Sequence, residues 1–146
     1  MKIRSATISD SDAVTDLLKS IEGVWQLDWR FDSVCRAISA ADGLAFVAVE
    51  EGQVVGFICG HDLGFRAYLS EFVVAESHQR AGIGKALLRS LEEALSRRGC
   101  RLVVADVYPP AEPFYRALGW GAPSAVLLSH CTPPFSDRHD DGHRSC

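Results

Sequence analysis

The sequence predicts an α/β fold in which a mixed, mainly antiparallel central sheet is flanked by helices. Runs rich in aromatic and β-branched residues alternate along the chain with runs whose apolar residues recur every three or four positions. A junction that contains two glycines joins one such strand to an amphipathic helix. The length of 146 residues and the hydrophobic share of 47% suffice for one domain with an ordinary core. We expect that domain to span residues 1–130, followed by a polar, flexible tail over residues 131–146.

The first half of the chain should contain three strands and two helices. The strands are expected at residues 2–7, 44–49 and 53–60, and the last two form a hairpin around Glu51 and Gly52. Ser9 or Asp10 is a suitable N-cap for a helix that ends near Ile21. Residues 23–29 interrupt this pattern, and a second helix follows at about residues 31–41. The buried residues of the two helices should be Val14, Leu17, Leu18, Ile21, Val34, Cys35 and Ile38.

The second half should begin with a strand over residues 68–74 and continue, after the glycine junction, into a long helix. This helix ends near Arg98, where Gly99 can stop it. A strand at residues 101–107, a short helix around Tyr115 and a last strand at residues 125–129 complete the prediction. The long helix should bury Ala86, Leu87, Leu91, Ala94 and Leu95.

The junction before the long helix reads Gln79-Arg80-Ala81-Gly82-Ile83-Gly84. Its glycines let the backbone approach a ligand closely and adopt dihedral angles that a Cβ would forbid. The N–H groups of the first helical turn lack partners within the helix, and the positive end of the helix dipole lies behind them. The junction is therefore a predicted binding site for an anion such as a phosphate.

Two common phosphate motifs do not fit this junction. A nucleotide P-loop needs a glycine where Gln79 stands and a hydroxyl residue where Ala86 follows Lys85. A dinucleotide fingerprint needs a third glycine at the position of Leu87. What remains is the pattern Gln/Arg-x-x-Gly-x-Gly/Ala between a strand and a helix.

That pattern resembles the acetyl-coenzyme A pyrophosphate loop of the GCN5-related N-acetyltransferases, the GNAT family. Residues 111–120 resemble a later motif of the same family, a short helix that carries a Tyr and ends in Leu-Gly-aromatic. Pro113 is tolerated in the first turn of this helix, and Gly119 can end it in a left-handed conformation. The resemblance covers roughly residues 1–130 and implies the acyl-CoA N-acyltransferase fold. Within the short helix we expect Tyr115 to project from a different face than its inward-packing neighbours Phe114, Leu118 and Trp120.

The resemblance also implies that acetyl-CoA is the co-substrate and that the central strand bulges near Val73 and Val74. Backbone groups there would bind the pantetheine arm, and the N–H of Val74 would polarise the acetyl carbonyl. Arg80 and Lys85 would add positive charge at the diphosphate, with a solvated helix start as the alternative role for both. The implied cofactor-binding residues are Phe72, Val73, Val74, Gln79, Arg80, Ala81, Gly82, Ile83, Gly84, Lys85 and Phe114.

Two side chains are candidates for proton transfer. By resemblance, Tyr115 is the general acid that protonates the departing sulfur, and a half-buried Tyr bonded to the backbone is the alternative. Glu71 is the candidate base, because strand alternation puts it on one face with Leu69 and Val73, beside the expected position of the thioester. A substrate anchor or a surface charge is the alternative role for Glu71.

Acidic and aromatic side chains gather in the segments that enclose the acceptor in this family. They favour a cationic amine held by charge and by aromatic faces. The candidate substrate-binding residues are Trp25, Trp29, Asp62 and Glu71, although packing alone would also explain the two tryptophans. The predicted reaction is direct attack of the amine on acetyl-CoA in a ternary complex. A small cationic molecule of the aminoglycoside kind is the favoured acceptor, and an amine of a peptide or protein is the second choice.

Two positions depart from the family pattern. Tyr108 stands where the later motif usually has Asn, seven residues before Tyr115, so a contact to the pantetheine arm is lost or replaced. The branch that acetylates ribosomal protein N-termini carries a carboxylate where Val103 stands, and Asp106 is offset from that position. The missing carboxylate at Val103 weakens the hypothesis of a protein acceptor. The replacement of Asn by Tyr108 leaves open a regulatory domain that binds acyl-CoA and transfers nothing.

Composition and charge argue against several other classes. The net charge of −4 disfavours a nucleic-acid partner, and the sequence contains neither a bilayer-spanning apolar run nor a signal peptide, so no membrane partner is expected. The five scattered cysteines lack a Cys-x-x-Cys pair and predict reduced thiols in a cytoplasmic protein. Dimers are frequent in the family, which makes a homodimer a candidate assembly. No metal is expected, with one minor alternative, a site built from His130, Cys131, His139, Asp140 and His143.

Overall fold

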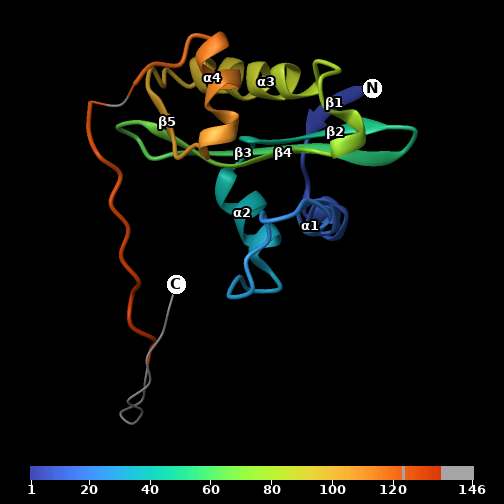
Figure 1. Ribbon diagram of the computed structural model, residues 1–146, viewed down its shortest axis with the longest axis horizontal. Coiled ribbons are helices and arrows are strands. Elements are labelled where there is room, and N and C mark those ends of the chain that lie inside the picture. The colour runs from blue at the N-terminus through green and yellow to red at the C-terminus, as the bar shows by residue number, and fades with distance from the viewer. Residues whose placement is uncertain (123, 136–146) are drawn as a thin grey trace. The chain divides into compact units, whose positions relative to one another are not determined.

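The computed structural model describes residues 1–122 and 124–135, and the chain divides into two compact units, Met1–Asp106 and a second one that begins at Val107. The first unit contains the sheet (Figure 1). Its strands are β1 (Lys2–Ser5), β2 (Ala45–Glu50), β3 (Gln53–Asp62), β4 (Ala67–Val74) and β5 (Val103–Ala105). Its helices are α1 (Ser11–Ser20), α2 (Ser33–Ala41) and α3 (Ile83–Arg97), with 3-10 turns at Ile8–Asp10 and Glu76–His78.

The five strands lie in the order β1-β2-β3-β4-β5. All neighbouring strands are antiparallel except β4 and β5, which are parallel because α3 carries the chain back between them. Figure 1 shows α3 on one face of the sheet and α1 and α2 on the other. The predicted fold class, a mixed and mainly antiparallel sheet flanked by helices, is confirmed.

The turn predicted between β2 and β3 is also confirmed. Glu51 and Gly52 both have positive φ, 48° and 78°, and Glu50 pairs with Gln53 directly before and after them. Two successive left-handed residues characterise a tight hairpin turn, whose twist matches that of the flanking strands.

Two glycines of β3 allow α3 to pack closely on the sheet. A Cβ at Gly56 would lie 2.9 Å from Cδ1 of Leu87, and one at Gly60 would lie 2.8 Å from Cδ1 of Leu91. Both leucines are fully buried. A larger side chain at either glycine would therefore push the helix away from the sheet.

Asp10 ties the start of α1 to β1. Its carboxylate accepts two hydrogen bonds from the Arg4 guanidinium, at 2.7 and 2.8 Å, and one from the N–H of Thr7 at 2.8 Å. The bonds from Arg4 lower the pKa of the Asp10 carboxyl to about 2. Asp10 precedes the first residue of α1, as predicted, but its side chain caps backward to Thr7 instead of forward into that helix.

The other helix predictions hold with small corrections. α2 begins at Ser33, because Phe31 is 94% exposed and lies in the preceding loop. Ile21, which follows the last residue of α1, and Cys35 are half-buried instead of buried. On α3, Ala86 and Ala94 are half-buried and Leu88 is buried instead, because the larger leucine reaches into the interior where the small alanine side chains do not.

The bulge of the central strand lies at Ser70, not at Val73 and Val74. Cys59 pairs with Glu71, whereas its neighbour Gly60 pairs with Leu69, which leaves Ser70 as the extra residue of β4. From Glu71 to Val74 the pairing with β3 is continuous. The family resemblance therefore implied a bulge in this strand but misplaced it.

The position of this bulge changes which side chains share a face. Leu69 lies opposite Gly60, whose α-carbon faces α3, while Glu71 lies opposite Cys59 on the face of α1 and α2. The prediction that Glu71 shares a face with Leu69 is wrong, because simple alternation does not count the extra residue. Glu71 and Val73 do share a face, since no irregularity lies between them.

The second unit contains a 3-10 turn (Pro109–Ala111) and α4 (Glu112–Ala117). Pro113 lies in the first turn of α4 and Gly119 has a φ of 92°, both as predicted. The predicted orientation of the aromatic residues is wrong, because Tyr115 is 8% exposed while Phe114 is 38% exposed. Gly119 turns the chain back, so that the ring of Trp120 packs edge-on against Tyr115 at a centroid distance of 5.1 Å.

Residues 125–129 do not form the predicted strand. Val126, Leu127 and Leu128 are exposed, and none of these residues is part of a helix or strand. Within the described part of the chain no strand lies alongside them, and a lone strand gains no ladder hydrogen bonds.

Three of the cysteines, Cys35, Cys59 and Cys100, are free thiols as expected. Cys131 is disulfide-bonded, so the expectation of five reduced thiols is wrong. This cysteine lies outside the helices and strands.

Candidate functional site

The glycine junction forms an irregular turn between β4 and α3. After the 3-10 turn Glu76–His78, the side chain of Gln79 donates a hydrogen bond from Nε2 to the carbonyl oxygen of Val74 at 3.1 Å. Arg80 and Gly82 both adopt left-handed backbone conformations, with φ of 64° and 82°. α3 then begins at Ile83. These two residues redirect the chain between the 3-10 turn and the first turn of α3.

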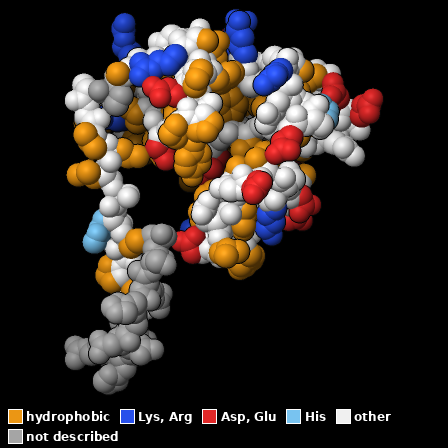
Figure 2. Space-filling view, in the orientation of Figure 1, with side chains coloured by type: hydrophobic (Ala, Val, Ile, Leu, Met, Phe, Trp, Pro, Cys, Tyr) orange, Lys and Arg blue, Asp and Glu red, His pale blue; other side chains and the backbone are white. Residues whose placement is uncertain are grey.

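This turn has the properties of an anion site. The backbone N–H groups in the first turn of a helix lack partners within the helix, which applies to α3 from Ile83 through Lys85. A Cβ at Gly82 would meet no atom within 4 Å, so the space above the turn is open. Ala81, Arg80 and Lys85 are exposed, and Figure 2 shows Lys and Arg side chains along the α3 side of the sheet.

The outer edge of β4 is the second part of the site. β5 pairs with β4 only from Ala67 to Leu69, and among the described residues no strand pairs with the rest of that edge. The N–H of Ala75 donates to Val55 of β3 at 2.8 Å. Alternation of the backbone then directs the amide groups of Val74 and Phe72 to the opposite, outer edge. An extended ligand with amide groups can bind such an edge as an additional strand would.

Glu71 lies on the same strand, with its side chain on the face covered by α1 and α2. Burial raises the pKa of its carboxyl to about 7, and the negative charge of Asp106 acts in the same direction. Asp106 follows β5 and accepts a hydrogen bond from the hydroxyl of Tyr68 on β4. Tyr68 lies opposite His61, on the face that also carries Glu71.

A polar cluster surrounds the bulge beside Glu71. Oγ of Ser70 lies 2.9 Å from Nε2 of His61 and 3.3 Å from the carbonyl oxygen of Cys59. Sγ of Cys59 lies 3.6 Å from the same His61 nitrogen. Burial lowers the pKa of His61 and raises the pKa of the Cys59 thiol to about 12. Both groups are therefore uncharged near neutral pH, and the cluster binds the bulge to β3.

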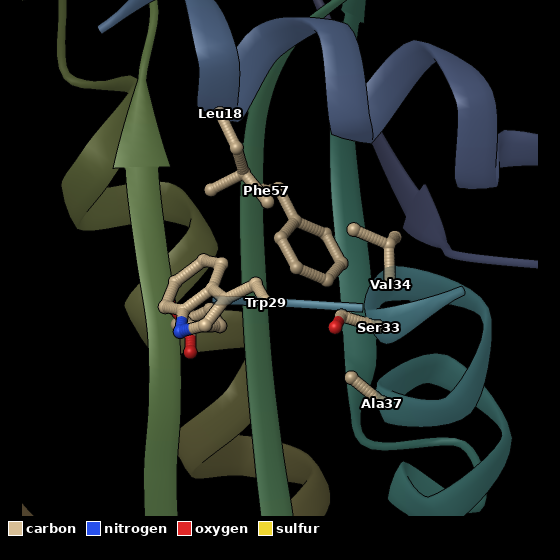
Figure 3. Close-up of a pocket in the computed structure, with 7 residues that line it drawn as sticks. Leu18, Trp29, Ser33, Val34, Ala37 and Phe57 are labelled. Carbon is tan, nitrogen blue, oxygen red and sulfur yellow. The ribbon is translucent and has the colours of Figure 1, made fainter. Parts of the chain in front are cut away.

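A cavity of about 240 Å³ opens next to Glu71 between the sheet and α1 and α2 (Figure 3). In Figure 3 the indole of Trp29 lies on one side, Ser33 and Ala37 of α2 lie on the other, and Phe57 of β3 lies between them. Its lining consists of Leu18, Trp29, Ser33, Val34, Ala37, Phe57 and Glu71. Glu71 is the one ionisable residue in this lining, so the cavity combines an apolar wall with a single carboxylate.

The predicted substrate-binding residues differ in their position relative to the cavity. Trp29 lines the cavity, and the ring of Trp25 packs edge to face with that of Trp29 at a centroid distance of 5.3 Å. Nζ of Lys19 lies 4.9 Å from the centroid of the Trp25 ring. Asp62 is exposed and outside the cavity lining, and its carboxylate accepts a hydrogen bond from the N–H of Gly64 at 2.9 Å.

Tyr115 and Phe114 belong to the second unit. Their rings meet edge-on at a centroid distance of 5.5 Å, and Tyr115 is enclosed between Phe114 and Trp120. Tyr108, which replaces the family's Asn, is 71% exposed at the start of the turn before α4.

Sequence reasoning did not single out Tyr68, His61 and Ser70, and it treated Asp106 only as a misplaced carboxylate. Strand periodicity located Tyr68 and Ser70 on β4, but the pairing with β3 and β5 brings them together with His61 and Asp106. The available signal was the number of polar residues in an otherwise apolar strand, Tyr68, Ser70 and Glu71 within four positions.

Residues 11–120 match the model of the acetyltransferase (GNAT) family. The chain belongs to the GNAT family. It is 34% identical over 71 residues to the chloroplastic GCN5-related N-acetyltransferase 3 of Arabidopsis thaliana, a match that covers 48% of this chain and 30% of that protein. It is 38% identical over 55 residues to the glucosamine 6-phosphate N-acetyltransferase of Trypanosoma brucei brucei, covering 38% of this chain and 37% of that protein. The matches thus span about a third of the length of these curated relatives.

The fold of this GNAT protein also occurs in solved structures. The PaiA N-acetyltransferase of Thermoplasma acidophilum, crystallised in complex with coenzyme A, superimposes with a TM-score of 0.69 at 18% identity. The superposition covers 86% of this chain and 92% of that one. At this level of identity the likeness concerns the fold.

The described residues contain no group of three or more His, Cys, Asp or Glu side chains placed to hold a metal ion. His139, Asp140 and His143, which the sequence offered as ligands, lie outside the described residues. Within residues 1–122 and 124–135, no helix is long and apolar enough to cross a bilayer.

Proposed function

We propose that this GNAT protein transfers an acetyl group from acetyl-CoA to a primary amine of a small cationic molecule. The observation that carries the proposal is the start of α3, where left-handed Gly82 leaves open space above the N–H groups of the first helical turn. A diphosphate fits these donors, and Arg80 and Lys85 add positive charge. The coenzyme A complex of PaiA, a protein of the same fold, supports acetyl-CoA as the donor.

The outer edge of β4 suits the rest of the donor. The pantetheine arm carries two amide groups, which can pair with backbone groups along the part of this edge that β5 does not cover. The N–H of Val74 is the proposed hydrogen-bond donor to the acetyl carbonyl, a type of interaction that contributes about 3 kcal/mol to catalysis. Val73 shares the face of Glu71, so the same strand would present the thioester and the base.

Glu71 supports an amine as the acceptor. An alkylammonium ion has a pKa of about 10 in water and must lose a proton before its nitrogen can attack. The half-buried Glu71 carboxylate can take that proton, because a low-dielectric site favours the neutral acid and amine over the ion pair. The nitrogen then forms a bond to the acetyl carbon while the carbon–sulfur bond breaks. The thiolate leaves with the bonding electrons and takes a proton, for which Tyr115 is the proposed donor. The acylated nitrogen loses its second proton to solvent, and solvent returns a proton to Tyr115.

A thiol-release assay with acetyl-CoA and a panel of amines tests this proposal. Release of free coenzyme A that depends on an amine, together with a matching acetylated product, supports it. Coenzyme A binding without thiol release for any small amine, peptide or protein would instead favour an acyl-CoA-binding regulatory domain, to which the replacement of the family's Asn by Tyr108 points. Acetylation of peptides but not of small amines would assign the acceptor to the protein class.

A further inference from the structure

We propose that the cavity beside Trp29 selects a primary monoamine with a compact apolar substituent, and rejects polyamines and aminoglycosides. The inference rests on the proposed function and restricts the class of amine that accepts the acetyl group. The ammonium group would lie at Glu71, and the substituent would lie against Trp29 and Phe57. It follows from the chemistry of the cavity lining and from the placement of the neighbouring acids.

The lining can balance one positive charge. Five of its seven residues are apolar or aromatic, Ser33 supplies one hydroxyl, and Glu71 supplies the single carboxylate. A second ammonium group or a set of sugar hydroxyls in such a cavity would lose its water without gaining partners. Each unpaired polar group of this kind lowers affinity by roughly tenfold or more.

Three other acids, Asp32, Asp62 and Asp106, are engaged elsewhere. The carboxylate of Asp32, next to Ser33, accepts a hydrogen bond from the Arg36 guanidinium at 2.6 Å. The carboxylate of Asp62 accepts the N–H of Gly64 in an exposed turn outside the cavity lining. The carboxylate of Asp106 accepts the hydroxyl of Tyr68. A polycationic acceptor would need several free carboxylates around one cavity. Glu71 is the one carboxylate in the cavity lining.

The size and rigidity of the cavity favour a small ring or short alkyl group. Its volume of about 240 Å³ lies below the range of roughly 300–1,000 Å³ that is usual for drug-sized ligands. The rings of Trp29 and Trp25 meet edge to face, and the backbone N–H of Trp29 donates a hydrogen bond to the carbonyl oxygen of Gln26 at 3.1 Å. A braced indole offers a flat apolar surface at little cost in side-chain entropy, which suits an aryl or branched alkyl substituent.

Ala37 and Ala40 provide a matched pair of variants on α2. Ala37 lines the cavity, whereas the side chain of Ala40 is exposed on the same helix. Ala37→Leu therefore fills part of the cavity, and Ala40→Leu adds the same atoms outside it. Equal melting temperatures and equal coenzyme A affinities would show that both variants keep the fold.

The experiment titrates 2-phenylethylamine, spermidine and kanamycin into the coenzyme A-saturated protein by calorimetry and measures kcat/KM for each with acetyl-CoA. We expect 2-phenylethylamine to bind at least tenfold more tightly than the other two. Ala37→Leu should weaken its binding at least tenfold, and Ala40→Leu should change it less than twofold.

Two results would overturn the inference. One is tighter binding of spermidine or kanamycin to the unmodified protein, a result that needs no variant and so does not depend on the folding of Ala37→Leu. The other is an equal effect of the two leucine substitutions. Absence of acetyl transfer to any amine would refute the proposed function, while the titrations would still decide which amine the cavity accepts.

Discussion

The hydroxyl of Tyr68 on β4 donates a hydrogen bond to the carboxylate of Asp106, 38 residues further along the chain. The bond joins the two parallel strands where their pairing ends, since Leu69 and Ala105 are the last partners in register. It holds a negative charge on the face that carries Glu71, and that charge contributes to the raised pKa of the Glu71 carboxyl. A structural bond between strands thereby tunes the proposed base.

Replacing Asp106 should shift the pH dependence of the reaction. Asp106→Asn removes the like charge, so the pKa of Glu71 falls below its present value of about 7 while burial still keeps it raised. The base is then deprotonated at lower pH, and the rising limb of kcat/KM against pH moves to the acid side. Near Glu71, Tyr68 and Cys59 stay protonated because both have raised pKa values, and His61 stays neutral near pH 7 because burial lowers its pKa.

The matched control for this shift is Asp62→Asn, which removes an equal charge from an exposed position. Its pH profile should coincide with that of the unmodified protein. Identical profiles for Asp106→Asn and the unmodified protein would remove Asp106 from the electrostatics of the site.

Glu71→Gln should remove the rising limb altogether. Loss of a general base typically lowers the rate about 10²–10⁴-fold, and the loss should be largest above pH 7, where the carboxylate is the dominant form. The measurement is kcat/KM for thiol release across the pH range, with Glu76→Gln, an exposed acid after β4, as the control. A raised KM with an unaltered pH curve would assign Glu71 to amine binding only.

Gly82→Val should weaken coenzyme A binding about tenfold or more. A β-branched residue at a φ of 82° costs about 1–2 kcal/mol of backbone strain and places methyl groups where the diphosphate is proposed to bind. Calorimetric titration with coenzyme A measures the effect. Gly52→Val is the control, since Gly52 has a similar φ of 78° and open surroundings in the β2–β3 turn. A comparable loss of affinity in both variants would mean that strain alone explains it.

Tyr115→Phe should lower kcat while leaving the affinity for acetyl-CoA nearly unchanged. The substitution keeps the ring that packs between Phe114 and Trp120 and removes only the hydroxyl. If the hydroxyl protonates the thiolate, turnover falls about 10²-fold or more. Tyr108→Phe removes a hydroxyl from an exposed ring and serves as the control. Equal turnover in the two variants would exclude Tyr115 from the chemistry.

Some parts of this protein were readable from the sequence because they are local. The left-handed glycines at positions 82 and 119, the hairpin turn at Glu51 and Gly52, and the amphipathic faces of α1 and α3 all follow from a few consecutive residues. These features also identified the GNAT family, since the motifs that carry the resemblance are a loop at a helix start and a short capped helix.

Other parts depended on partners distant in the chain. The bulge at Ser70 exists only in the pairing of β4 with β3, and it decides that Glu71 faces α1 and α2 while Leu69 faces α3. The burial of Tyr115 follows from Trp120 turning back onto it, and the absence of a strand at residues 125–129 follows from the lack of a neighbour in the described residues. Sequence periodicity predicts that successive residues of a strand alternate between faces, but it cannot detect a bulge, which shifts that alternation by one residue.

The sequence by itself thus determined the fold class, the family and the left-handed turn before α3, because short-range backbone preferences and hydrophobic periodicity specify these. Only the tertiary structure decided the environment of the Glu71 side chain. Its raised pKa, the apolar cavity beside it and its neighbour Asp106 arise from segments between positions 18 and 106 that meet on one face of the sheet. Burial and electrostatic coupling depend on distances in space, which long-range strand pairing and helix packing set.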